Sequence, residues 1–134
     1  MDALLMSRFV PPPGQRLLVV GGCGGMGRAL VQAALALGLQ VVVLDRPQAL
    51  ADHPVPAGVM ALACDVSQEA QVLAAFEQVQ AHWGAIDALV NMAGYTGERI
   101  PLAQMRTQEW DDIVNTDLRG MFLITRAAAP LLQA

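Results

Sequence analysis

The sequence predicts an α/β fold with a Rossmann-type doubly wound parallel sheet of about four strands, in the order 3-2-1-4, flanked by helices. Short aliphatic and β-branched runs alternate with longer segments of helical periodicity. Alternation of this kind is typical of parallel sheets with right-handed helical crossovers. A glycine-rich turn follows the first strand, where such sheets bind phosphate groups. We expect one domain over residues 16–134 and an N-terminal arm over residues 1–15, which Pro-Pro-Pro-Gly separates from the first strand.

The first half of the domain has the pattern of a strand, a helix and a second strand. Residues 16–20 and 40–44 are short apolar runs, and the second is rich in β-branched residues, as expected for a strand covered on both faces. Residues 25–37 form the predicted helix, which Gly38 ends. Residues 47–56 are expected to form a loop or a broken helical turn. The apolar face of the helix is expected to contain Ala29, Leu30, Ala33, Ala34 and Leu37.

The second half adds two strands and two helices. The strands are predicted over residues 58–63 and 86–90. Ser67 is expected to cap a helix that runs to about Trp83. Thr107 is expected to cap a last long helix, and Pro130 is expected to kink or end it. Its apolar face is expected to contain Trp110, Ile113, Val114, Leu118, Met121 and Phe122.

Composition argues against several classes of function. The chain has 134 residues, a net charge of −4 and 54% hydrophobic residues, which is enough to build one well-packed core. Its basic residues are all arginines and are scattered, whereas a nucleic-acid-binding face needs clustered positive charge. No apolar run approaches the roughly 20 residues that span a bilayer. With no secretory signal pattern and only two cysteines, we expect a reducing, cytoplasmic setting and no membrane partner.

Residues 21–27, Gly-Gly-Cys-Gly-Gly-Met-Gly, connect the first strand to the first helix. Glycine permits positive φ and lets a ligand approach the backbone, and a helix N-terminus attracts an anion. The run therefore predicts a dinucleotide site. Gly22, Gly24 and Gly27 fit the spacing G-x-G-x-x-G, whereas Gly21, Gly25 and Gly27 fit a looser one. A tight turn without a ligand is the alternative.

Asp45 ends the second strand, where a carboxylate can accept hydrogen bonds from both ribose hydroxyls of an adenosine. The same charge would repel a 2′-phosphate, so Asp45 favours NAD over NADP. Arg46 is the opposing feature, because an arginine can pair with that phosphate. The alternative interpretation of Asp45 is a solvated acid at the end of a strand.

Two more polar positions follow strands at the same edge of the sheet. Asp65 follows the third strand, and it serves either a ligand or the start of the next helix. Asn91-Met92-Ala93-Gly94 follows the fourth strand. The small residues let a cofactor pass close to the backbone, and the Asn91 amide is able to join neighbouring strand ends.

Together these positions resemble the short-chain dehydrogenase/reductase family, and specifically the N-terminal half of its domain. The family's turn Thr-Gly-x-x-x-Gly-x-Gly is matched at Gly21, Gly25 and Gly27, which favours this spacing over the other. Residues 91–94 are similar to its Asn-Asn-Ala-Gly, and residues 117–122 to its Asn-Leu-x-Gly-x-Phe. The resemblance implies NAD, or less favourably NADP, held by Gly21, Gly25, Met26, Gly27, Asp45, Arg46, Asp65, Val66, Asn91, Ala93 and Gly94.

The catalytic residues of the family are mostly absent. The family uses a serine, a Tyr-x-x-x-Lys pair and a helix asparagine, and its lysine lowers the pKa of the tyrosine. This sequence has no lysine, and its one tyrosine, Tyr95, precedes Arg99 in a different part of the fold. Asp117 stands at the asparagine position and is the catalytic candidate, and Asn115, two residues away, is the alternative for that position. In the family the serine and the tyrosine follow the segment that these residues match.

Three functions remain open at this point. The first is the cofactor-binding part of an oxidoreductase that transfers a hydride between NAD and an alcohol or carbonyl, inactive without its missing catalytic residues. The second is a non-catalytic nucleotide-binding or oligomerisation module, in which the exposed fourth strand and the last helix pair with another copy. The third, which residues 91–94 disfavour, is a methyltransferase that uses S-adenosylmethionine.

Overall fold

A four-stranded parallel sheet forms the centre of the computed structural model, which describes residues 10–133. The strand order is β3-β2-β1-β4, so the predicted fold class and strand order are confirmed. The strands are β1 (Arg16–Val20), β2 (Gln40–Asp45), β3 (Met60–Ala63) and β4 (Ala88–Asn91). All three pairings are parallel, so the carboxyl ends of the strands lie along one edge of the sheet.

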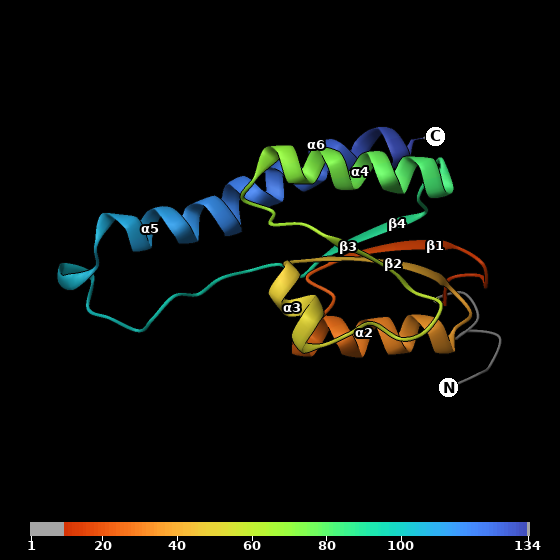
Figure 1. Cartoon of the computed structure of the whole chain (residues 1–134), viewed down its shortest axis with the longest axis horizontal. Helices are drawn as coiled ribbons and strands as arrows, with labels where there is room; N and C mark the ends of the chain where they lie inside the picture. Colours follow the sequence, from red (N-terminus) through yellow and green to blue (C-terminus); the bar gives the residue numbers. More distant parts are fainter. Residues whose placement is uncertain (1–9, 134) are drawn as a thin grey trace.

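Helices cover both faces of this sheet (Figure 1). On one face lie α2 (Gly25–Ala36) and the short α3 (Pro47–Asp52), which occupies part of the segment expected to be a loop or a broken turn. On the other face, α4 (Glu69–Trp83) and α6 (Gly120–Leu132) lie side by side. The sheet is therefore the middle layer of a three-layer sandwich.

Alternation along β1 divides the core into two clusters. Leu18 and Val20 pack with residues of α4 and α6, whereas Leu17 and Val19 pack with residues of α2. Neighbouring side chains of a strand point to opposite faces, and here both faces are covered. This is the physical reason that β1 is apolar at successive positions rather than at alternate ones.

The predicted apolar face of α2 is only partly correct. The helix buries Gly27, Val31 and Ala34, whereas Ala29 and Ala33 are exposed. Gly27 fixes this rotation, because its lack of a side chain lets the first turn of α2 lie directly on the preceding glycine turn. Close backbone approach, rather than the largest apolar stripe, decides which face of α2 is inward.

The last helix departs most from its predicted pattern. It consists of α5 (Thr107–Val114), a π-helical segment η2 (Asn115–Arg119) and α6, which continues through Pro130 to Leu132. Arg106, rather than the predicted Thr107, is the N-cap residue of α5. A π turn holds more residues than an α turn, so it breaks a single continuous stripe. As a result α6 buries Leu123, Ile124, Ala128 and Leu131, while four predicted core residues are exposed, namely Trp110, Leu118, Met121 and Phe122.

The expected N-terminal arm lies largely outside the described residues. Where it is described, its end is tied to the domain: the Gly14 N–H donates to the Gly38 carbonyl at 2.8 Å, and the Gln40 N–H donates to the Gln15 carbonyl at 2.9 Å. The boundary between arm and domain at residue 15 stays a prediction.

The amino ends of β1 and β4 are joined by an ion pair. Arg16 donates from Nε and Nη2 to the two carboxylate oxygens of Asp87, each at 2.9 Å, and its backbone N–H donates at 2.7 Å. These hydrogen bonds lower the pKa of Asp87 to about 2. Because a carboxyl in an unfolded chain has a pKa of about 3.9, the ionised form of Asp87 stabilises the folded state above that pH, and this stabilisation is lost as pH falls toward 2.

Asp87→Asn is therefore expected to lower the thermal midpoint at pH 7, and this deficit should shrink between pH 4 and pH 2. Thermal unfolding followed by circular dichroism across this range measures it. Asp111→Asn, at an exposed position of α5, is the control, and it should leave the midpoint nearly unchanged. A deficit of the same size at pH 2 and pH 7 would contradict the assigned role of the ion pair.

Candidate functional site

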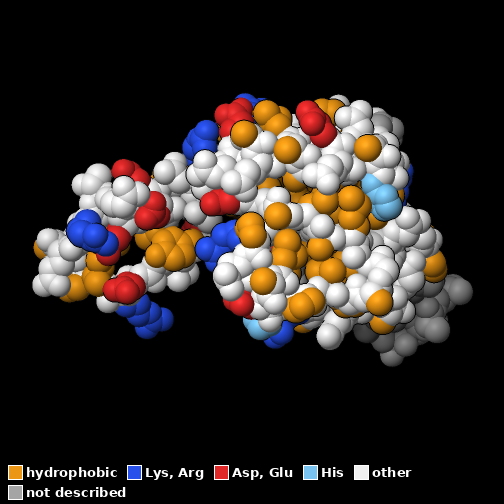
Figure 2. Space-filling model, in the orientation of Figure 1, with side chains coloured by type: hydrophobic (Ala, Val, Ile, Leu, Met, Phe, Trp, Pro, Cys, Tyr) orange, Lys and Arg blue, Asp and Glu red, His pale blue; other side chains and the backbone are white. Residues whose placement is uncertain are grey.

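A cleft of about 1240 Å³ opens along the carboxyl edge of the sheet. The loops that follow all four strands line it, together with α3, α5 and the π segment. Figure 2 shows the hollow between the projecting α5 region and the body of the molecule. Ligands of open parallel sheets bind outside the carboxyl ends of the strands, so this cleft is the candidate site.

Three glycines of the turn are required by the protein itself. Gly21 has φ of +77°, and a Cβ there would lie 2.6 Å from the backbone nitrogen of Ala93. A Cβ on Gly22 would lie 2.6 Å from the side chain of Val43. One on Gly27 would lie 2.1 Å from the Gly21 carbonyl oxygen. Because these three residues have no side chain, β1, β2, α2 and the segment after β4 approach one another closely at one point.

Gly25 differs from these three, because a Cβ there would meet no atom of the protein within 4 Å. It is the first residue of α2 and lines the cleft. No acidic side chain lies in the first turn of α2, and no side chain caps its N-cap residue Gly24. Backbone N–H groups of this turn are therefore free to face an anion, with the positive end of the helix dipole behind them. Open space at this point fits a pyrophosphate group.

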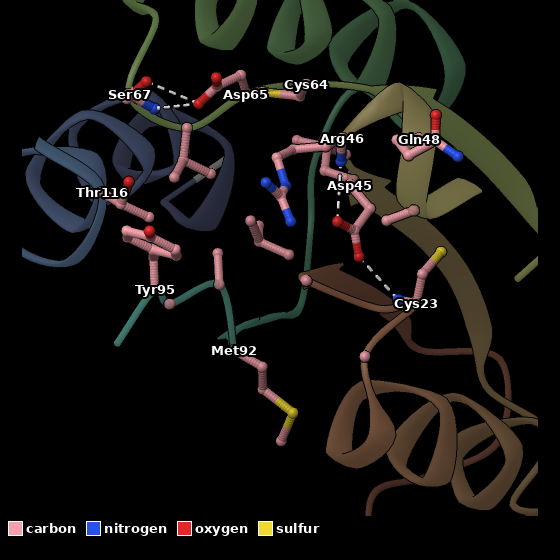
Figure 3. A pocket seen from close by; sticks show the side chains of 18 of the residues that line it. Cys23, Asp45, Arg46, Gln48, Cys64, Asp65, Ser67, Met92, Tyr95 and Thr116 are labelled. Atoms are coloured by element: carbon pink, nitrogen blue, oxygen red, sulfur yellow. Dashed lines mark hydrogen bonds between the residues drawn. The ribbon is translucent and has the colours of Figure 1, made fainter. Parts of the chain in front are cut away.

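Asp45 lies at the end of β2, where its carboxylate supports the glycine turn. Its Oδ2 accepts the N–H of Cys23 and its Oδ1 accepts the N–H of Arg46, both at 2.8 Å (Figure 3). A carboxylate oxygen can accept more than one hydrogen bond, and Asp45 is only half-buried in the cleft wall. Both oxygens therefore keep capacity for a ribose hydroxyl.

Two arginines, Arg28 and Arg46, supply positive charge to the cleft that Asp45 lines. Arg46 is exposed, and its guanidinium extends into the cleft (Figure 3). Arg28 also lines the cleft, and its Nη1 lies 3.2 Å from Nδ1 of His53 at the end of α3. The part of the cleft beside Asp45 thus carries both signs of charge.

Asp65 contributes to the cleft and also organises the start of the next helix. Its Oδ1 accepts the Ser67 N–H at 2.9 Å and the Ser67 hydroxyl at 2.7 Å. Ser67 is not the helix cap, because α4 begins at Glu69 with Gln68 as its N-cap residue. The Ser67 side chain is instead engaged with Asp65. Both interpretations of Asp65 thus remain compatible with its position, because the residue also lines the cleft.

The segment after β4 forms another wall of the cleft. Ala93 and Gly94 line it, as do Met92 and Tyr95. Asn91 lies behind this wall, and its Oδ1 accepts the Ala93 N–H at 3.1 Å. The Asn91 side chain thus bonds within its own segment rather than, as expected, to a neighbouring strand. The ends of β1 and β4 are joined instead by a backbone hydrogen bond from the Met92 N–H to the Val20 carbonyl at 2.8 Å.

Four predicted site residues do not line the cleft, namely Met26, Gly27, Asn91 and Asp117. Met26 is 74% exposed in the first turn of α2. Asp117 lies in the π segment, and its Oδ1 accepts the Tyr95 N–H at 2.7 Å. The catalytic role that the resemblance implies for Asp117 stays a prediction. Asn115, two residues from Asp117, lines the cleft, and structure alone adds Gln48, Gln108, Asp112 and Thr116.

The two cysteines of the cleft wall are poor nucleophiles. Burial, followed by the charge of Asp65, raises the pKa of Cys64 to about 11, and burial likewise raises the pKa of Cys23. Both thiols are therefore protonated near neutral pH. Within residues 10–133, no cluster of His, Cys, Asp or Glu has the arrangement of a metal site. Thiolate chemistry is thus not a property of this cleft.

Comparison with known proteins agrees with this geometry. Residues 15–134 match the family model described as short chain dehydrogenase. The chain belongs to this family of oxidoreductases. It is 32% identical over 118 residues to the 3-oxoacyl-[acyl-carrier-protein] reductase FabG of Escherichia coli, covering 85% of this chain and 48% of the relative. It is 36% identical over 133 residues to the short chain dehydrogenase mpl6 of Monascus purpureus, covering 89% and 45%. The chain thus spans about half the length of these curated relatives.

Solved structures show the same likeness. The 3-ketoacyl-(acyl-carrier-protein) reductase of Brucella melitensis, complexed with NADH, is similar with a TM-score of 0.82 and 32% identity, covering 89% of this chain and 50% of that one. The ligand-free aldohexose dehydrogenase of Thermoplasma acidophilum has a TM-score of 0.79 and 27% identity, covering 90% and 45%. In the part of this chain that the structure describes, no helix is both long and apolar enough to cross a membrane.

Proposed function

We propose that this chain binds NAD as the cofactor-binding part of a short-chain dehydrogenase/reductase, a class that transfers a hydride between the nicotinamide and an alcohol or carbonyl. The observation that carries the proposal is the open space over Gly25 at the amino end of α2, beside Asp45. The protein itself does not require a glycine there, whereas a pyrophosphate passing over the turn does.

Each part of the cofactor has residues of suitable chemistry in the cleft. The pyrophosphate is assigned to the turn containing Gly21, Gly25 and Gly27, with Met26 exposed beside it. Asp45 is suited to accept the hydroxyls of the adenosine ribose. The adenine is assigned to the wall formed by Arg46, Asp65 and Val66, and the nicotinamide end to the segment with Asn91, Ala93 and Gly94. When bound, the cofactor supplies or accepts the hydride.

The preference for NAD over NADP rests on Asp45. A 2′-phosphate at the ribose would lie against this carboxylate, and like charges repel. Arg46 and Arg28 work in the opposite direction, because both line the same part of the cleft. The charge of Asp45 is expected to decide the cofactor preference, because two backbone N–H groups hold its carboxylate in place. The Arg46 side chain, in contrast, extends freely into the cleft (Figure 3).

Fluorescence titration with NADH, NADPH and S-adenosylmethionine tests cofactor binding and choice. The wild-type chain should bind NADH in preference to NADPH and should not bind S-adenosylmethionine. Gly25→Ala should weaken NADH binding by about tenfold, or roughly 1.4 kcal/mol, because its methyl group occupies the space of the pyrophosphate. Asp45→Asn should reduce the preference for NADH over NADPH by a similar factor, since it removes the opposing charge.

Two controls separate binding from folding in this experiment. The unfolding midpoint of Gly25→Ala should not fall, because the added methyl meets no protein atom within 4 Å. Asp111→Asn removes the same charge at an exposed position of α5 that does not line the cleft, so it should leave both affinities unchanged. Wild-type protein that binds neither dinucleotide would refute the proposed function.

We also propose that these 134 residues do not catalyse hydride transfer by themselves. The sequence contains no lysine. Ser67 is hydrogen-bonded to Asp65 at the start of α4. Tyr95 is followed by Arg99 in the loop after β4, and an arginine does not deprotonate to play the part of a lysine. Proton transfer to or from a substrate therefore lacks its usual acid–base group.

Incubation of the purified chain with NAD and a panel of primary and secondary alcohols measures this directly. No NADH absorbance above the enzyme-free blank is expected, even at cofactor concentrations that saturate the cleft. Formation of NADH in proportion to protein concentration, and its loss in Gly25→Ala, would show that the chain is a complete catalyst.

Self-association is a second proposed property, for which exposed apolar surface is the specific observation. Within the described residues β4 is an end strand of the sheet, with one edge unpaired. The neighbouring α6 is joined to the segment before β4, because the Ile86 N–H donates to the Leu131 carbonyl at 3.0 Å. Just beyond the π segment, Met121 and Phe122 are 53% and 57% exposed, and Leu118 is 69% exposed. A second copy of this chain would cover both features through one symmetric interface.

Light scattering after size exclusion is expected to give a mass above the 14.2 kDa of one chain. Leu118→Glu with Met121→Glu should shift the protein toward the monomer, because buried charge opposes association. Leu37→Glu, on the opposite face of the sheet, is the matched control and should not change the mass. A wild-type monomer at millimolar concentration would disprove this proposal.

A further inference from the structure

The π segment η2 (Asn115–Arg119) interrupts a long helix where that helix passes the cleft. Asn115 and Thr116 line the cleft, and in Figure 3 Thr116 lies between Ser67 and Tyr95. Ser67 belongs to the loop after β3, and Tyr95 to the loop after β4. Single π turns inside α-helices are frequent at functional sites, and this one lies between two walls of the proposed cofactor cleft.

Asp117 reaches the loop after β4. Its Oδ1 accepts the Tyr95 N–H at 2.7 Å, and the same oxygen would lie 3.7 Å from a Cβ on Gly94. Residues 92–101 form neither helix nor strand. The loop therefore lacks the ladder of hydrogen bonds that regular structure would supply, and the contact with Asp117 fixes its position next to the helix.

Arg119 reaches the loop after β3. Its Nη1 donates to the Ser67 carbonyl at 2.7 Å, and its Nη2 lies 3.5 Å from Oε2 of Glu69 at the start of α4. Residues two positions apart on a helix do not share a face. This difference in direction lets Asp117 and Arg119 contact two different loops from a single turn.

Gly120 brings the helix close to the loop after β3. A Cβ on Gly120 would lie 2.8 Å from Cγ2 of Val66, so a larger residue would push the helix away from the cleft wall. Val66 is buried, and it is one of the residues assigned to the adenine. The hydrogen bond from Arg119 therefore acts at the place where helix and loop already pack together.

We propose that the π segment is a brace for the cofactor cleft, in which Asp117 and Arg119 are positioning residues that fix the loops 65–68 and 92–95. The expected effect of this brace on cofactor affinity rests on the proposed NAD-binding function. Neither side chain lines the cleft. They act by holding the two walls in the binding geometry before the cofactor arrives, which reduces the ordering cost of binding.

Hydrogen exchange with mass spectrometry, combined with NADH titration, tests the brace. Asp117→Ala should speed exchange in residues 93–96, and Arg119→Ala in residues 65–68, each mainly in its own loop. Each variant should weaken NADH binding by about tenfold. Asp117→Asn retains an oxygen that accepts the Tyr95 N–H, so it should restore both exchange and affinity to near the wild-type values.

Arg126→Ala is the matched control for Arg119→Ala. Arg126 also pairs with Glu69, and its guanidinium carbon lies 4.9 Å from the centre of the Phe122 ring. The Ser67 carbonyl accepts its hydrogen bond from Arg119 and not from Arg126. It should therefore leave exchange in residues 65–68 and NADH affinity nearly unchanged. Equal effects of the two arginine variants would mean that the ion pair with Glu69, rather than the bond to Ser67, accounts for the result, and would overturn the brace.

The remaining outcomes separate this inference from the proposed function. Exchange in both loops that is unaffected by Asp117→Ala and Arg119→Ala overturns the brace, whether or not NADH binds. Faster exchange throughout the chain, with a lower unfolding midpoint, assigns the two residues to general stability and also overturns it. Selective loop exchange in a protein that fails to bind NADH supports the brace and refutes the NAD-binding function.

Discussion

The contact of Gly27 with the backbone of Gly21 and Gly22 sets the position of α2 on the sheet, because a Cβ on Gly27 would lie 2.1 Å from the Gly21 carbonyl oxygen. From this contact follow the inward face of α2 and the direction of its N-terminus toward the cleft. Gly21, with positive φ, admits the segment after β4 to the same point. One steric constraint thus places three elements of the proposed site.

The proposed function separates cofactor binding from catalysis in these residues. The cleft has an open helix N-terminus, a fixed carboxylate at Asp45 and small residues after β4, which together suit a nicotinamide dinucleotide. Its thiols are held protonated by burial, and Ser67 is engaged with Asp65. These observations support the proposal that the residues bind the cofactor without catalysing hydride transfer by themselves. The relatives it resembles are about twice as long.

The interrupted helix 107–132 connects the cleft with the exposed surface of the protein. Its π segment faces the cleft through Thr116, whereas Leu118, Met121 and Phe122 are exposed to solvent. A change in the direction of the helix face at this segment explains both facts, because the extra residue of a π turn shifts the register between α5 and α6. The same segment therefore bears on cofactor binding and on the proposed contact with another copy.

The sequence alone determined the fold class, the strand order and the family, because strand periodicity and glycine spacing are local properties of the chain. It also placed Asp45, Asp65 and residues 92–94 at one edge of the sheet, since parallel topology brings strand ends together. Only the tertiary structure decided the inward face of α2, the exposure of Trp110 and Met121, and the contacts of Asp117 and Arg119. These depend on close backbone approach and on a π turn, which helical periodicity does not encode.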